Sequence, residues 1–429
     1  MLLASSAPIF ATVYRTIGFV LFLVVLVAVA AYVLVNVLFA GKSELGAEIE
    51  LAANRKPYYP DEVLEGPKLD RALSVGLLTL MVLAVGVPLY WIMEPGRQEN
   101  AAVTFRDTFE SRGEAMFATT GANPQALNCA GCHGNLDGGV VQDYPLVSPA
   151  TGLVDLVDWQ APALGTVLLR YSREEVRYIL VYGRPGSPMP AWGVEGGGAL
   201  NDQQIQNIVD YLDLNTADPG AANTDMVEHL DAYLAAEFED GEPVFSGPNA
   251  EGQALFNMGL LDGFAGGAFG CARCHTAGWS YAERPVAFDA EGNPVTGPEG
   301  QIVVDRDAFE AITANSGCGG EFGFNLCDGD TERQFPENEE PGEGESPLQG
   351  MIDFITEGSE DGQGYGRRGQ GSGRMPGFGV RPGEPAVYWL NGGEEREPGQ
   401  GLLTPEQIEA IVEYERTLTS SEAAGSAQP

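Results

Sequence analysis

Two pentapeptides decide the fold of this chain: Cys129-Ala-Gly-Cys132-His133 and Cys271-Ala-Arg-Cys274-His275. Cys-x-x-Cys-His is the attachment pattern of a c-type haem. Two thiols at this spacing can add to the two vinyl groups of one porphyrin, and the adjacent imidazole then ligates the iron axially. The sequence therefore predicts two covalently bound haem c groups, with His133 and His275 as iron ligands.

A Cys-x-x-Cys pair can also hold zinc or act as a thioredoxin-like redox pair. Structural zinc takes four protein ligands. The chain has three His and six Cys, and the two pentapeptides already contain two of the His and four of the Cys. Duplication of the complete pattern therefore favours haem.

Two uncharged apolar stretches, at residues 17–40 and 72–93, precede the pentapeptides. Each can cross a hydrocarbon core of about 30 Å at 1.5 Å per residue, so we expect a membrane anchor of two transmembrane helices within residues 1–100, in contact with lipid. A signal peptide is the alternative for the first stretch, but its apolar core usually has only about 7–15 residues.

The basic residues around these stretches predict the orientation of the anchor. Arg15 alone precedes the first stretch, whereas the intervening segment contains Lys42, Arg55, Lys56, Lys68 and Arg71. By the positive-inside rule this segment is cytoplasmic. We therefore expect a multi-pass protein of the cell membrane, with its N-terminus and haem domains on the extracytoplasmic side.

The charge of the chain is strongly negative, at −38, and residues 95–429 carry 17 basic and 53 acidic side chains. Nucleic acid and anionic lipid surfaces are therefore poor partners, whereas a basic electron carrier would be attracted. Adaptation of an exported surface to salt explains the charge equally well.

Cys318 and Cys327 lie outside both pentapeptides. In an oxidising extracytoplasmic space they can form a disulfide, with two free thiols as the alternative.

An internal repeat surrounds the pentapeptides. Gly113-Glu-Ala-Met-Phe117 and Gly252-Gln-Ala-Leu-Phe256 precede them, and residues 200–211 and 403–414 follow at a constant offset of 203. The latter pair predicts two amphipathic closing helices, capped by Asn201 with Gln204 and by Thr404 with Gln407. Their matching signals indicate two copies of a small helical domain.

Each copy also contains a methionine in a turn rich in Gly and Pro, in the shared pattern Met-Pro-x-aromatic-Gly: Met189 after Gly183, and Met375 after Gly373. A thioether is a soft ligand, and the following proline restricts the turn that presents it. Met189 and Met375 are thus the predicted sixth iron ligands. Met226 and Met351, in apolar helical patterns, are predicted core residues, and His229 is expected on a solvent-facing linker helix.

This order of elements resembles the class I cytochrome c fold, twice. The resemblance implies a mainly α chain with domain 1 at 101–215, a linker at 216–244, domain 2 at 245–420 and a disordered tail at 421–429. It also implies haem wrapped by three to five helices, with His133 and Met189, and His275 and Met375, as axial pairs. The second copy departs in its His-to-Met spacing, 100 residues instead of 56. We expect an insertion at 280–350, as a surface loop or a docking site.

Iron ligated by His and Met has no open position for a substrate, so we expect electron transfer without a substrate-binding haem. The chain resembles the dihaem subunit of an actinobacterial-type cytochrome bcc complex, which implies cytochrome b and Rieske subunits and a cytochrome c oxidase as partners. The dihaem subunit of a cbb-type oxidase is an alternative, and a dihaem peroxidase is an alternative from another class.

Overall fold

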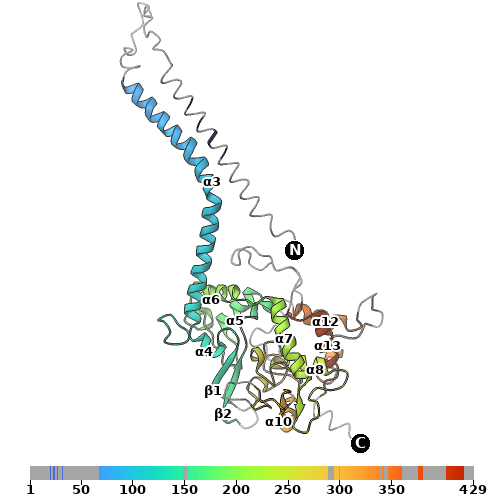
Figure 1. Ribbon diagram of the computed structural model, residues 1–429. Helices are drawn as coiled ribbons and strands as arrows, with labels where there is room; N and C mark the ends of the chain where they lie inside the picture. The colour runs from blue at the N-terminus through green and yellow to red at the C-terminus, as the bar shows by residue number, and fades with distance from the viewer. Residues whose placement is uncertain are drawn as a thin grey trace, which may run out of the picture. The chain divides into compact units, whose positions relative to one another are not determined.

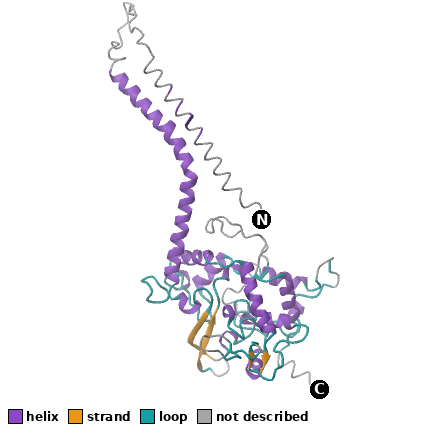
Figure 2. Cartoon of the chain, in the orientation of Figure 1, coloured by secondary structure: helices purple, strands orange, loops and turns teal. Residues whose placement is uncertain are grey.

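The computed structural model describes Val20, Leu23, Val24, Val27 and Ala31, and then residues 67–147, 152–287, 294–298, 300–338, 341–342, 346–359, 375–379 and 402–419. The chain divides into two compact units, Met1–Thr104 and Phe105–Pro429. Helices predominate among the described residues, and the two small sheets have two strands each (Figures 1 and 2).

Helix α3 (Pro67–Phe117) contains the second predicted span, 72–93, and continues past residue 100 to Phe117. Within the part of the chain that the structure describes, it is the one helix long and apolar enough to cross a membrane. Its large apolar side chains are exposed, with Leu73 at 62 % and Trp91 at 74 %. This pattern is typical of a helix whose solvent is lipid. All but five residues of the first predicted span, 17–40, lie outside the described residues.

The segment after α3 forms the first hydrophobic core. Its elements are α4 (Cys129–His133), β1 (Gly139–Val147), β2 (Val154–Ala161), η1 (Val167–Leu169), α5 (Arg173–Tyr182), η2 (Val194–Gly196) and α6 (Asp202–Leu214). Ile205, Ile208 and Val209 of α6 are buried in this core. The antiparallel hairpin of β1 and β2 was not predicted.

The following residues form a second core. Its elements are α7 (Pro219–Leu234), β3 (Glu237–Phe238), α8 (Ala250–Phe256), η3 (Phe264–Gly267), α9 (Ala272–His275), η4 (Trp279–Tyr281), β4 (Val303–Val304), α10 (Arg306–Thr313), α11 (Asp330–Gln334), α12 (Gln349–Glu357) and α13 (Pro405–Glu415). Helix α7, expected as a linker, contributes Met226, Leu230 and Tyr233 to this core. It packs there because one face of the helix is apolar.

The same close helix crossing recurs in both cores. A Cβ on Gly113 would lie 2.4 Å from the Asn207 carbonyl oxygen, and a Cβ on Gly252 would lie 1.9 Å from the Ala410 carbonyl oxygen. Beside each glycine an aromatic pair packs with ring centroids 5.4 Å apart, Phe117 on Tyr211 and Phe256 on Tyr414. Both closing helices begin with the predicted reciprocal caps.

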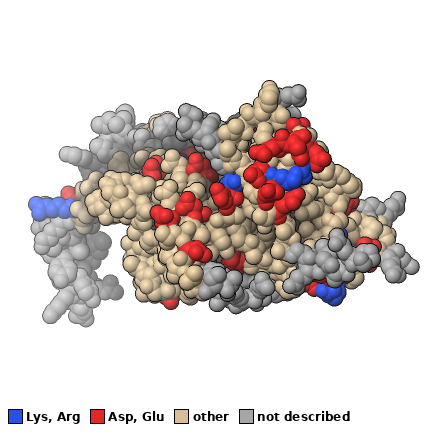
Figure 3. Space-filling model, turned by 90° about the horizontal axis from the view of Figure 1, so that it is seen from below, with Lys and Arg blue, Asp and Glu red and all other residues tan. Residues whose placement is uncertain are grey.

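The surface of the described residues is acidic. On the face shown in Figure 3, Asp and Glu side chains occur at many places and Lys and Arg at few. Arg306 is a cation paired with two acidic side chains, because its guanidinium lies 2.9 Å from both Asp240 and Glu242. The dominant field is therefore attractive to cations.

The sequence predicted that His229 faces solvent, but the structure shows that its side chain also contacts Asp262. Its side chain on α7 is 35 % exposed, and its Nδ1 lies 2.6 Å from a carboxylate oxygen of Asp262. Its ring stacks on Phe264 with centroids 3.9 Å apart. The hydrogen bond to Asp262 raises the pKa of His229 above 6.5.

Replacing Gly252 by alanine will destabilise the second core, because the new methyl group meets backbone atoms of α13 and the two helices must separate. We expect a loss of about 1–3 kcal/mol, the usual cost of overpacking. Thermal unfolding of the detergent-solubilised chain measures it. Gly350→Ala is the matched control, since a Cβ there meets nothing within 4 Å. Equal melting temperatures for the two variants would contradict this interpretation.

The His229–Asp262 pair makes stability depend on pH. Because the folded-state pKa is raised, the contribution is complete below about pH 6.5, the unfolded value, and is lost as the pH rises through the folded value. His229→Gln will remove this component, so its melting temperature will differ from wild type more at about pH 6 than at about pH 8. Parallel curves for the two proteins across this range would refute the assignment.

Candidate functional site

The first site is built on the short helix α4, which ends in His133. The Nδ1 atom of His133 lies 2.9 Å from the carbonyl oxygen of Pro162, directly after β2. Cys129 and Met189 both pack against the first core. The structure therefore brings the predicted attachment residues and the predicted methionine to one core, although His133 and Met189 are 56 positions apart.

The methionine loop of the first site starts at Gly183, which ends α5 with a φ of +69°. A Cβ on Gly183 would lie 2.7 Å from the Met189 carbonyl oxygen. The Arg184 amide donates to the same carbonyl at 3.0 Å, and the Trp192 amide returns to Leu180 at 2.9 Å. The loop is thus held against the last turn of α5.

The second site repeats this arrangement on α9. The Nδ1 atom of His275 lies 2.9 Å from the carbonyl oxygen of Phe324. Gly358 ends α12 with a φ of +80°, and a Cβ there would lie 2.5 Å from the Met375 carbonyl oxygen. The Ser359 amide donates to this carbonyl at 3.0 Å, and the Phe378 amide returns to Ile355 at 3.0 Å.

These matching hydrogen bonds make Met375 the counterpart of Met189. They also change one alignment, because the counterpart of Gly183 is Gly358 and not Gly373. Gly358 precedes its methionine by 17 positions, whereas Gly183 precedes Met189 by six. Part of the extra length of the second copy therefore lies between Gly358 and Met375, beyond the predicted insertion at 280–350.

A cavity of about 1120 Å³ of empty space, some of it open to solvent, lies at the second site. Cys271, Cys274, His275 and Met375 all line it. Met351, predicted as a core residue, is 2 % exposed and also lines the cavity, but from within α12 rather than from the turn that matches Met189.

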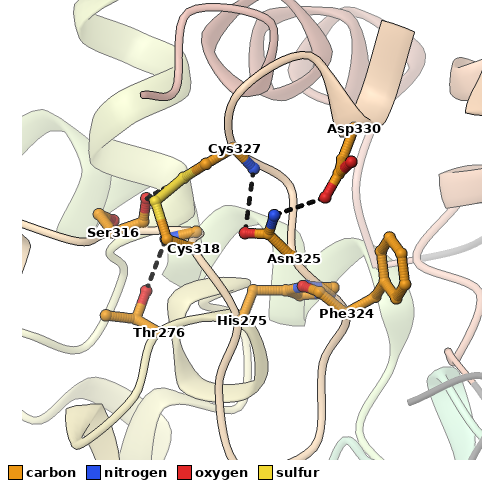
Figure 4. Close-up of a disulfide and its surroundings, with 9 residues drawn as sticks. His275, Thr276, Ser316, Cys318, Phe324, Asn325, Cys327 and Asp330 are labelled. Carbon is orange, nitrogen blue, oxygen red and sulfur yellow. Dashed lines mark hydrogen bonds between the residues drawn. A yellow bond between two sulfur atoms is a disulfide. The ribbon is translucent and has the colours of Figure 1, made fainter. Parts of the chain in front are cut away.

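A disulfide closes the loop that supplies the partner of His275. Cys318 and Cys327 are bonded, and Phe324 lies between them in the sequence (Figure 4). The Gly317 amide donates to the Thr276 hydroxyl at 3.1 Å, and the Cys327 amide donates to the Asn325 side chain at 3.4 Å. The first bond attaches the loop to the residue after His275, and the second lies within the loop, beside Phe324.

Burial keeps the site residues uncharged. It lowers the pKa of both His133 and His275, against the opposing effect of their carbonyl partners. It raises the pKa of the Cys129 thiol to about 11 and that of Cys271 well above its usual value. A neutral imidazole is the form that ligates a metal. The protonated thiols do not resemble activated redox cysteines, whose pKa is low.

The residues present fit a haem c. A carbonyl bound to Nδ1 holds each imidazole in the tautomer that leaves Nε2 free for a metal. In the second site a thioether and an imidazole line one cavity together with two thiols. Among the described residues, no group of three or more His, Cys, Asp or Glu side chains is arranged to hold a metal ion by itself.

Several residues of the second cavity were not predicted from the sequence. They are Arg170, Tyr171 and Arg184 from the first segment, and Arg273 and Glu415 from the second. Glu415 had a detectable signal, because the offset of 203 aligns it with the apolar Leu212 of the first closing helix. Arg273 had one too, because it lies between the cysteines of the second pentapeptide. Arg170 and Arg184 had none, since their sequence positions do not indicate which surfaces meet.

Residues 111–215 match the family model of cytochrome c. This segment contains the first pentapeptide, Met189 and α6, and it is therefore a cytochrome c domain, with the covalent haem c and the electron-transfer role that such a domain implies. The match ends before the second pentapeptide. Comparison with curated proteins and with solved structures gave no match.

Replacing Cys318 and Cys327 together by serine will lower stability, because the disulfide restricts the unfolded chain. The usual loss is about 2–4 kcal/mol. Unfolding of the variant in denaturant, compared with wild type under non-reducing conditions, measures it. Haem attachment will persist, since neither cysteine belongs to a pentapeptide. Unchanged stability would show that the disulfide has no structural role.

Proposed function

We propose that this chain is a membrane-anchored dihaem c-type cytochrome that relays electrons in a respiratory chain. The observation that carries the proposal is the repeated histidine geometry, in which Nδ1 of His133 and of His275 lies 2.9 Å from a backbone carbonyl oxygen. The second pentapeptide belongs, on this proposal, to a second cytochrome c domain. Its methionine loop has the same hydrogen bonds as that of the domain at 111–215.

The proposed ligands favour a relay over an enzyme. A haem with His and Met on its two faces exchanges electrons and offers no vacant iron position to oxygen or peroxide. The chain's own residues then have three tasks. They attach the group through cysteines, hold the histidines in one tautomer, and present Met189 and Met375 from turns that two glycines allow. A dihaem peroxidase would need one of these methionines to leave its iron.

The proposed location is the cell membrane, with α3 as one of two transmembrane helices and the haem domains outside the cytoplasm. The exposed apolar surface of α3 supports the membrane location. The basic residues before α3 support the orientation. For partners we propose cytochrome b and Rieske subunits of a bcc complex and a cytochrome c oxidase. The acidic surface suits a basic partner (Figure 3).

One observation favours a second candidate. Helix α3 runs directly into the first cytochrome domain, so the anchor precedes the haem domains. The dihaem subunit of a cbb-type oxidase, which this chain also resembles, has its anchor in this N-terminal position. Purification in mild detergent distinguishes the two, because cytochrome b and a Rieske protein would accompany a bcc subunit, and an oxidase core alone would accompany the other.

Intact-mass measurement of the purified chain will show two added haem masses. Replacing Cys129 and Cys132 together by serine will remove one of them, and so will replacing Cys271 and Cys274. The Cys318→Ser, Cys327→Ser variant is the matched control and will retain both. A wild-type chain with a single added mass would reject the second haem, and a chain with none would reject the proposal entirely.

A further inference from the structure

The second cavity is not enclosed by its own domain alone. Two arginines and a tyrosine of the first domain, Arg170, Tyr171 and Arg184, line it together with Arg273 of the second pentapeptide. Three guanidinium groups from two domains therefore share one cavity with Cys274 and His275. This concentration of positive charge is unusual in a chain of net charge −38.

Arg184 connects the two sites directly. Its amide is bonded to the Met189 carbonyl, so its backbone belongs to the methionine loop of the first site. Its side chain donates to the Tyr171 hydroxyl at 2.9 Å, and its guanidinium carbon lies 5.3 Å from the centroid of the Phe322 ring. The next residue, Gly323, donates its amide to the Cys274 carbonyl at 2.7 Å.

Arg273 makes a second connection. It lies between the two cysteines of its pentapeptide, and its side chain donates to the Gln160 carbonyl of β2 at 2.9 Å and to the Gly266 carbonyl at 2.5 Å. Pro162, which binds His133, follows Gln160 by two positions. Arg273 therefore fastens the second attachment segment to the strand that orients the first histidine.

Among the described residues, no ion pair joins Arg184 or Arg273 to a carboxylate, and Glu175 acts on Arg184 only through its longer-range charge. Burial, with repulsion from Arg184 and Arg170, lowers the pKa of Arg273 to about 10, which leaves it cationic at pH 7. Glu415 does not offset it, because burial raises the pKa of this cavity carboxyl to about 8.

The two cations come from different copies. The counterpart of Arg273 in the first pentapeptide is Gly131. The counterpart of Arg184, by the hydrogen bonds of the methionine loops, is Ser359. Each copy thus supplies one cation, Arg184 from the first and Arg273 from the second, and both line the second cavity. Arg273 also acts on the first site, where its charge adds to the burial that lowers the pKa of His133.

We propose that Arg184 and Arg273 raise the reduction potential of the second haem. This rests on the proposed function, because it requires a haem at each site. Reduction adds one electron, supplied by the one-electron donor of the relay, and transfers no proton. It lowers the charge of the site by one, and cations that line the same cavity stabilise that product.

The test is a spectroelectrochemical titration of the full chain in detergent. Arg184→Gln will lower the equilibrium constant for reduction of one haem about tenfold, since a unit charge is removed at close range. For a one-electron couple this is a shift of about 59 mV towards negative potential. Arg184→Lys keeps the charge and will retain most of the wild-type potential. Met375→Ala, which alters the second haem alone, identifies the affected potential.

Arg306→Gln is the matched control, because it removes a cation of the same domain that is paired with Asp240 and Glu242 outside the cavity. It will leave both potentials in place. Arg273→Gln will shift the same haem as Arg184→Gln. If it instead prevents haem attachment, Arg184→Gln, which leaves the pentapeptide intact, decides the matter. Unchanged potentials in Arg184→Gln, or an equal shift in Arg184→Lys, would overturn the proposal. A chain with one haem mass would overturn the proposed function instead.

Discussion

An imidazole ligates a metal in a defined orientation only when its second nitrogen is held. In this chain that constraint is met twice by a backbone carbonyl, from Pro162 and from Phe324, at the same distance of 2.9 Å. Each carbonyl must in turn be placed by its own loop. In the first site the loop follows a β-hairpin, and in the second it is closed by a disulfide. Two different structures thus serve one requirement of ligand chemistry.

The framework around the histidines is more uniform than the loops. In both copies a glycine allows the closing helix to approach at backbone distance, and an aromatic pair packs beside it. A second glycine with positive φ turns the chain into the methionine loop. A side chain at any of these four positions would collide with backbone atoms or with the base of a neighbouring side chain, so the backbone geometry itself requires them. The insertions of the second copy lie outside this framework.

Uniform frameworks leave the differences between the sites to individual side chains. Gly131 and Leu212 of the first copy correspond to Arg273 and Glu415 of the second, by the offsets of the pentapeptides and closing helices. Both replacements put an ionisable group into a buried setting, where charge is costly and its effect on a neighbouring centre is large.

Local patterns in the sequence determined the capping boxes of α6 and α13, the apolar length of α3 and the two methionine turns, because each depends on residues a few positions apart. The haem-attachment residues are a prediction of the same local kind. Patterns of that kind failed for the β1–β2 hairpin, for α7 as part of the second core and for His229 beside Asp262, because those contacts join distant segments. The tertiary structure alone decided that Gly358 is the partner of Gly183, and that Arg170 and Arg184 of the first domain enter the cavity of the second site. Which surfaces of two domains meet is set by packing over the whole unit, and no local run of residues contains that information.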